Sequence, residues 1–209
     1  MARIEPFEKH TAKYEDWFER NRFIYASELA AIKGQLPAGG RGVEIGVGSA
    51  RFAAPLGVEF GIEPSPLMRK IAEQRGIKVV GSVAEKLPFA DDRFDLALMV
   101  TTICFLDDVD AAFAEVYRIL KPGGCFLIGF IDKNSPLGKS YLAHKTENVF
   151  YRVATFYSVE EVVLHLRETG FNDFVFVQTI FHDLREVTDM EPAKTGFGEG
   201  SFVVVKGWK

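Results

Sequence analysis

Two carboxylates and two glycines occur in an order that suits the binding of a nucleotide. Glu44 stands near the end of a short apolar segment, and Gly46 and Gly48 follow it closely. Glycine has no Cβ and tolerates positive φ, so a turn built from these residues can bring its backbone directly against a ligand. A second apolar segment further along ends in Glu63. Strand, glycine turn, helix, strand and acid, in this order, form the outline of a nucleotide-binding βαβ unit.

The same turn lacks what two common nucleotide sites require. A dinucleotide-binding turn has the pattern G-x-G-x-x-G, and Arg51 stands where the third glycine is needed. The chain also contains no G-x-x-x-x-G-K-[ST] segment, which is the phosphate-binding loop of many ATPases and GTPases. A nicotinamide-dependent oxidoreductase and a P-loop nucleotidase are therefore both disfavoured.

The segments that carry these residues alternate between predicted strands and predicted helices. Strands are expected at 41–45, 58–62, 77–80, 94–100 and 125–131, and helices at 50–56, 66–75 and 109–120. Ser65 and Pro66 are a typical N-cap and first helical residue. This alternation predicts a parallel sheet with helices on both faces, and ligands then bind at the carboxyl ends of the strands.

Two segments outside this alternation are expected to contribute to the ligand site or to pack on the sheet. From about Thr11 to Leu36, apolar residues at helical spacing predict two helices with a break near Asn21, and 37–40 ends them. These helices either cover a sheet face or close over the ligand. Residues 132–157 form a long polar and aromatic connection at the ligand end of the sheet, which is typical of a functional, partly helical flap.

The C-terminal part predicts one more helix and two strands. Ser158 and Glu161 have the spacing of a capping box, and Gly170 is a natural helix end. Strands are expected at 171–181 and 201–205. The linker between them lacks the pattern of a crossover helix, so these strands are expected to pair antiparallel.

Composition places the chain among ordinary globular proteins. It has 209 residues, 47% apolar and 26% charged, and these values favour a single domain. The net charge of −4 argues against nucleic-acid and anionic-membrane partners. Cys104 and Cys125 are expected to be buried free thiols, no metal-ligand spacing is present, and no apolar run is long enough to span a bilayer. These features, with no signal-peptide pattern at the N-terminus, lead us to expect a cytoplasmic protein.

Three motifs, taken with Glu63, resemble those of a known enzyme family. They are Glu44-Ile-Gly46-Val-Gly48-Ser-Ala50, Ala84-Glu-Lys-Leu-Pro-Phe89 with Phe94-Asp95 after it, and Arg118-Ile-Leu-Lys-Pro-Gly-Gly124. Their order and spacing resemble the class I S-adenosylmethionine-dependent methyltransferases, in particular the small-molecule group that includes the ubiquinone/menaquinone C-methyltransferases. The resemblance implies a Rossmann-like, seven-stranded, mostly parallel sheet with an antiparallel last strand. It also implies one domain over 1–209, with 1–40 as a helical cap and 132–157 as a flap insertion, in a monomer or homodimer.

The resemblance further implies that the cofactor is S-adenosyl-L-methionine and the product S-adenosyl-L-homocysteine. The residues implied to bind it are Glu44, Gly46, Gly48, Glu63, Pro64, Ser65, Ala84, Glu85, Leu87, Thr101 and Thr102. Two positions depart from the family pattern: Ala50 replaces the third glycine, and Val83 replaces the acid that meets the adenine amino group. Glu85 is equally consistent with a role as a charged surface residue that does not bind the cofactor. Thr101 and Thr102 are equally consistent with hydrogen bonding at the end of a strand only.

The implied reaction is a methyl transfer in which the protein aligns the acceptor and excludes water. A hydroxyl or ammonium acceptor needs a base within hydrogen-bond reach. Tyr14 and His144 are the catalytic candidates, with Tyr141 and His182 as further possibilities. The aromatic residues of both flanking segments favour a small apolar or aromatic acceptor, methylated on N, O or C. The alternative is a regulatory or protein-modifying module that binds the same cofactor. Arsenite methylation, which needs several reactive cysteines, is disfavoured.

Overall fold

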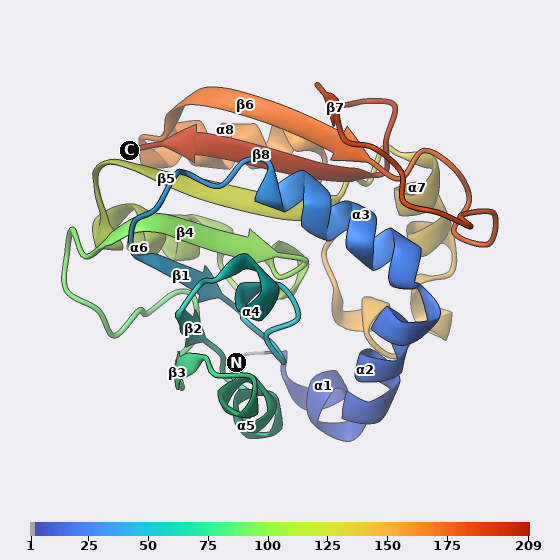
Figure 1. Cartoon of the computed structure of the whole chain (residues 1–209), viewed down its shortest axis with the longest axis horizontal. Helices are drawn as coiled ribbons and strands as arrows, with labels where there is room; N and C mark the ends of the chain where they lie inside the picture. Colours follow the sequence, from blue (N-terminus) through green and yellow to red (C-terminus); the bar gives the residue numbers. More distant parts are fainter. Residues whose placement is uncertain (1–2) are drawn as a thin grey trace.

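Eight strands form one sheet in the computed structural model, which describes residues 3–209 (Figure 1). They are β1 (Gly42–Ile45), β2 (Phe60–Ile62), β3 (Lys78–Val80), β4 (Phe94–Val100), β5 (Leu120–Ile131), β6 (Asn172–Thr179), β7 (Lys194–Thr195) and β8 (Phe202–Trp208). The strand order is β3-β2-β1-β4-β5-β8-β6-β7. The first five strands pair in parallel, and β8 runs antiparallel between β5 and β6.

This arrangement confirms the predicted Rossmann-like, mostly parallel sheet with an antiparallel last strand. The prediction of seven strands differs from the structure by one, because the two-residue strand β7 pairs with the edge of β6. A strand this short has no alternating pattern that a sequence can reveal. The predicted antiparallel pairing of the two C-terminal strands is confirmed, with Val177 opposite Val204.

Helices lie on both faces of the sheet (Figure 1). They are α1 (Glu5–Lys9), α2 (Thr11–Arg20), α3 (Arg22–Lys33), α4 (Ala53–Leu56), α5 (Pro66–Gln74), α6 (Val109–Ile119), α7 (Pro136–Ala143) and α8 (Val159–Thr169). Three short 3-10 turns, η1 (Ile103–Phe105), η2 (Lys145–Glu147) and η3 (Tyr151–Val153), complete the set in the described chain. The break near Asn21, the helix starts at Ser65 and Ser158, and the helix end at Gly170 are where the sequence predicts them.

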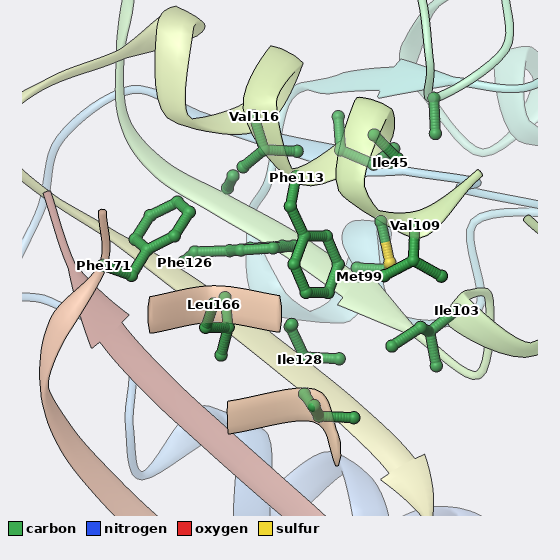
Figure 2. Close-up of a cluster of buried hydrophobic side chains, with 14 of the residues drawn as sticks. Ile45, Met99, Ile103, Val109, Phe113, Val116, Phe126, Ile128, Leu166 and Phe171 are labelled. Carbon is green, nitrogen blue, oxygen red and sulfur yellow. The ribbon is translucent and has the colours of Figure 1, made fainter. Parts of the chain in front are cut away.

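The alternation of side chains along β4 divides the interior into two cores. Ala97 and Met99 point into one core, which α6 and α8 cover. Figure 2 shows that core, where Phe113 from α6 meets Phe126 from β5 edge to face, with ring centroids 5.3 Å apart. Leu98 points into the opposite core, which α3 and α4 cover. A strand buried on both faces is apolar almost throughout, and this explains the composition of β4.

Three local expectations need correction. The helix expected over 50–56 covers only Ala53–Leu56, because the glycine turn extends further along the chain. Lys121 and the Pro-Gly-Gly that follows it do not separate a helix from a strand; they lie within β5 as an irregularity in its pairing with β4. The short helix α1 was not expected, since residues 1–9 carry no helical periodicity.

Residues 132–157 contain α7, η2 and η3 and lie beyond the carboxyl end of β5, close to α2 (Figure 1). Across residues 3–209, no helix is both long enough and apolar enough to cross a bilayer.

Candidate functional site

A cavity of about 440 Å³ opens at the carboxyl ends of the parallel strands. Its floor is made by strand ends and the glycine turn, including Gly46, Glu63 and Thr101. Its other walls come from α1, α2, α3 and the segment 132–157. The position agrees with the general rule for open parallel sheets.

The glycine turn needs glycine at two places for different reasons. Gly46 has φ of 70°, and a Cβ there would lie 2.3 Å from Thr102 Cγ2. Gly48 has φ of 53°, and a Cβ there would lie 3.1 Å from the hydroxyl oxygen of Tyr14. Without side chains, both residues leave their backbone open toward the cavity. The turn is therefore a cradle that a single methyl group would obstruct.

Ala50 takes the place of a third glycine and keeps the glycine conformation. Its φ is 65°, and its methyl group is completely buried against the core under α3 and α4. A left-handed alanine costs about 1–2 kcal/mol relative to a right-handed one. The departure from the family pattern therefore adds backbone strain at a residue that has a positive φ.

Glu63 holds the end of β2 against the glycine turn. Its Oε2 accepts a hydrogen bond from Gly48 N at 2.9 Å, and its Oε1 accepts one from Ser65 N at 2.8 Å. Burial raises the pKa of this carboxyl group. A carboxylate offers about four acceptor positions, so Glu63 retains capacity for a diol in the cavity.

Glu44 lies under the turn in the centre of the sheet. It is 1% exposed, and no hydrogen-bond donor in the described chain meets its Oε2. Burial raises the pKa of this carboxyl group well above its usual range. A buried acceptor without a partner is costly. Glu44 does not line the cavity, so the structure places this carboxyl group beneath the turn and not against the ligand space.

The end of β4 is joined to the same turn. Thr101 lines the cavity with φ of 49°, and its N–H donates to Gly129 O at 2.7 Å. The Thr102 hydroxyl lies 3.1 Å from Gly46 O and also lines the cavity. Both threonines therefore line the cavity beside the glycine turn.

The loop after β3 meets the cavity only in part. Ala84 and Glu85 line it, and so does Val83, which stands where the family resemblance implies an acid. Glu85 is no free surface charge, because its Oε1 accepts from the N–H groups of Asp107 and Asp108 at 2.9 and 3.2 Å. Glu85 therefore orders the loop that precedes α6.

Two predicted binding residues have other contacts. Leu87 is buried in the core beneath α6 and does not line the cavity. The Ser65 hydroxyl accepts from Met68 N at 3.2 Å and contacts Glu8, so it caps α5. Pro64, between Glu63 and Ser65, does line the cavity.

The two catalytic candidates lie in different places. Tyr14 on α2 lines the cavity above Gly48, with Phe18 at a centroid distance of 5.2 Å and Phe150 at 6.3 Å. Burial, followed by the nearby charge of Glu44, raises the pKa of Tyr14 far above its usual value. The phenol therefore stays protonated and has a hydrogen to donate.

His144 lies at the end of α7, exposed, with Nδ1 3.0 Å from Ser140 O. It borders a separate shallow depression and does not line the cavity. His182 is also exposed and pairs with Glu191 at 2.6 Å. Tyr141 does line the cavity, and its ring lies 4.4 Å from that of Tyr151.

An ion-pair cluster ties α2 to the glycine turn. Glu15 Oε2 lies 2.7 Å from Arg51 Nη2 and 2.5 Å from Arg75 Nη2, and Arg75 Nη1 also donates to Ser49 O at 2.5 Å. Arg51, the residue that excludes a dinucleotide turn, is thus a bridge to the N-terminal helices. Sequence spacing does not reveal such a cluster, since its members come from α2, the turn and the end of α5.

Glu28 is the other residue missed from the sequence. It lies on α3 at 4% exposure and lines the cavity. Burial raises its pKa to about 8. The sequence did contain a sign of it. Glu28 lies four residues after Ile24 and four before Ile32, so an acid stands on the apolar stripe of a predicted helix.

The sequence and the fold of this chain are both similar to those of known proteins. Residues 43–128 match the family described as a methyltransferase domain. An uncharacterized protein of Methanocaldococcus jannaschii is 43% identical over 203 residues, which cover 97% of this chain and 98% of that protein. A demethylmenaquinone methyltransferase of Roseiflexus is 36% identical over 101 residues, covering 42% of this chain and 41% of that one.

A solved structure from Thermotoga maritima agrees over nearly the whole chain. It is 50% identical with a TM-score of 0.96, and it covers 98% of both chains. That protein is described as an S-adenosylmethionine-dependent methyltransferase and a possible histamine N-methyltransferase.

Proposed function

This chain belongs to the S-adenosylmethionine-dependent methyltransferases, and we propose that it methylates a small acceptor with an apolar or aromatic body. The observation that carries the proposal is the cavity itself, in which the glycine turn and Glu63 share one space with an aromatic wall. That wall comes from the N-terminal helices and from residues 132–157, which act as cap and flap of a single domain over residues 1–209.

The residues at the sheet end of the cavity fit the family's cofactor. The cradle at Gly46 and Gly48 and the remaining acceptor capacity of Glu63 are the features on which that fit rests. Glu63 would hold the ribose, Glu44 would orient the turn or meet the ammonium group, and Pro64 and Ala84 would flank the adenosine. When bound, S-adenosylmethionine supplies an activated methyl group.

The chain's own task is then to align the acceptor and to keep water out. Tyr14 suits this role, because its phenol lies over the turn and stays protonated. We propose that it positions the acceptor by donating a hydrogen bond. Of the two catalytic candidates, His144 is the less well supported, because it lies outside the cavity.

The relatives suggest two acceptor chemistries. The Thermotoga protein's description points to an amine, and the Roseiflexus protein's name points to a quinol. A cofactor-binding regulatory or protein-modifying module is the alternative function. It is less well supported because α1, α2 and the segment 132–157 line the side of the cavity opposite the sheet, where a protein substrate would have to enter.

A methyl-transfer screen tests the proposal. The purified protein is incubated with S-adenosylmethionine and panels of amines, phenols, quinols and carboxylic acids, and release of S-adenosylhomocysteine is measured. We expect release with at least one panel, and a rise in melting temperature with S-adenosylhomocysteine but not with NADH. Cofactor binding with no release in any panel would favour the regulatory module.

A further inference from the structure

Glu28 is a buried acid with no partner in the part of the chain that the structure describes. Its side chain lines the cavity at 4% exposure, and none of the ion pairs or hydrogen bonds found among residues 3–209 involves its carboxyl oxygens. Leaving a carboxyl group unpaired in such a place costs several kcal/mol when it is charged. The fold has no evident structural use for it, since the neighbouring positions Ile24, Ala31 and Ile32 pack as ordinary core residues.

The groups that face Glu28 are aromatic. Tyr141 comes from α7 and Tyr151 from η3; burial first, and the Glu28 charge as a lesser cause, raise the pKa of both phenols. Tyr25 is the titratable neighbour on α3 itself. The loop 181–193 contributes Leu184 to the cavity, and it packs on α3 through a hydrogen bond from Glu191 N to the hydroxyl of Ser27.

The cavity's cations do not neutralise Glu28. Arg3 donates to Cys104 O and Val153 O, and Arg20 pairs with Asp16 at 2.7 Å. Lys13 lines the cavity from the exposed side of α2 and forms no ion pair with Glu28. The acid therefore faces aromatic rings and forms an ion pair with none of these three cations.

A cationic ligand with an apolar body matches this space. An ammonium group gains from a carboxylate at short range and from the faces of tyrosine rings. A metal ion is disfavoured, because a divalent cation needs several oxygen ligands, and among residues 3–209 Glu28 belongs to no group of three or more possible metal ligands. Resting on the proposed function, we infer that Glu28 is the counter-ion of the acceptor, and that the acceptor is a small amine that is protonated in water.

Binding by calorimetry tests this inference on the intact protein saturated with S-adenosylhomocysteine. The probes are benzylamine, phenethylamine and histamine, each set against an uncharged partner of similar shape, such as benzyl alcohol or phenethyl alcohol. The variants are Glu28→Gln, which keeps shape and removes charge, and Glu73→Gln, an exposed acid on α5 as the matched control.

We expect at least one amine to bind, and Glu28→Gln to weaken it about ten-fold or more. Glu73→Gln should leave the affinity for that amine unchanged. The matched alcohol should bind wild type and Glu28→Gln with the same affinity. Amine binding should also release a proton from the wild-type protein and none from Glu28→Gln, as measured in buffers of different ionisation enthalpy.

Equal affinity of wild type and Glu28→Gln for the amines would overturn the inference, and so would alcohols that bind as tightly as amines. Absence of any amine binding overturns it as well. The proposed function fails separately: it falls if no panel is methylated, whereas methylation of phenols or quinols alone removes the amine inference and leaves the methyltransferase.

Discussion

The side chain of Thr102 occupies the space that a Cβ on Gly46 would need. The hydroxyl of Thr102 lies 3.1 Å from Gly46 O, and its methyl carbon Cγ2 would be 2.3 Å from that Cβ. The two residues come from the turns that follow β1 and β4, which are neighbouring parallel strands. Their contact fixes the turn against the strand end, so the cradle has one shape.

Replacing Gly46 by alanine should therefore abolish cofactor binding. The clash with Thr102 forces the turn to move, and the positive φ adds about 1–2 kcal/mol of backbone strain. Gly57→Ala is the matched control, because its φ of 72° is close to the 70° of Gly46, but nothing lies within 4 Å of a Cβ built on Gly57. Calorimetry with S-adenosylhomocysteine should show binding for Gly57→Ala only; equal affinities would refute the role of the turn.

Glu63→Gln should weaken S-adenosylhomocysteine by about ten-fold or more, since a hydrogen bond to a charged group contributes about 1.5–3 kcal/mol. The amide also loses one of the acceptors that hold Gly48 and Ser65. Glu59→Gln, an exposed acid at the other end of β2 that pairs with Lys78 at 3.4 Å, serves as the control. Wild-type affinity in Glu63→Gln would show that the ribose is held elsewhere.

Glu28 should make the apoprotein less stable as the pH rises. Its pKa rises from 4.5 in the unfolded chain to about 8 in the folded protein because of burial. Below the lower value both states are protonated. Between the two values only the unfolded state ionises, so the free energy of unfolding falls with pH and levels off above the higher value.

Glu28→Gln removes the cost of burying this ionisable group. In urea denaturation, the free energy of unfolding of the variant should therefore rise relative to that of wild type as the pH increases from 4.5 to about 8. Other buried acids, such as Glu44, titrate alike in both proteins. Their contributions therefore cancel when the free energy of unfolding of wild type is subtracted from that of the variant. A stability difference that is flat with pH would contradict the burial of an ionisable Glu28.

Glu15→Gln should loosen α2 from the glycine turn. It weakens the pairing with Arg51 and Arg75, which are partly buried, and we expect a loss of about 1–2 kcal/mol in the free energy of unfolding. Asp16→Asn removes an exposed pair with Arg20 on the same helix and should cost only about 0.3–0.5 kcal/mol. Faster proteolysis near residues 10–21 in Glu15→Gln, and not in Asp16→Asn, is the second measurement. Similar losses of unfolding free energy in both variants would show that the cluster around Glu15 does not hold α2 on the glycine turn.

Tyr14→Phe removes the phenol above Gly48 and keeps the ring among its aromatic neighbours. We expect kcat to fall about ten-fold while S-adenosylhomocysteine still binds. His144→Asn should leave kcat unchanged, because that residue is exposed and outside the cavity. The reverse ranking in steady-state kinetics would return His144 to the catalytic role and remove Tyr14 from it.

Local patterns in the sequence were enough to predict the fold and the cofactor. The turn from Glu44 to Ala50, the acid at Glu63 and the cap at Ser158 each depend on residues that are near neighbours in the chain. Backbone conformation, helix starts and strand ends are set at that range, so the family and the sheet could be predicted. Val83 showed in the same way that the family's adenine acid is missing.

Only the tertiary structure decided which distant residues meet. The contact of Thr102 with Gly46, the bridge from Glu15 through Arg51, and the isolation of Glu28 all depend on how α2 and α3 lie against the strand ends. Spacing along a chain specifies which face of a helix is apolar, but not what that face will cover. Burial and pairing are properties of the packed chain, and they turn an acid in an apolar stripe into a candidate binding group.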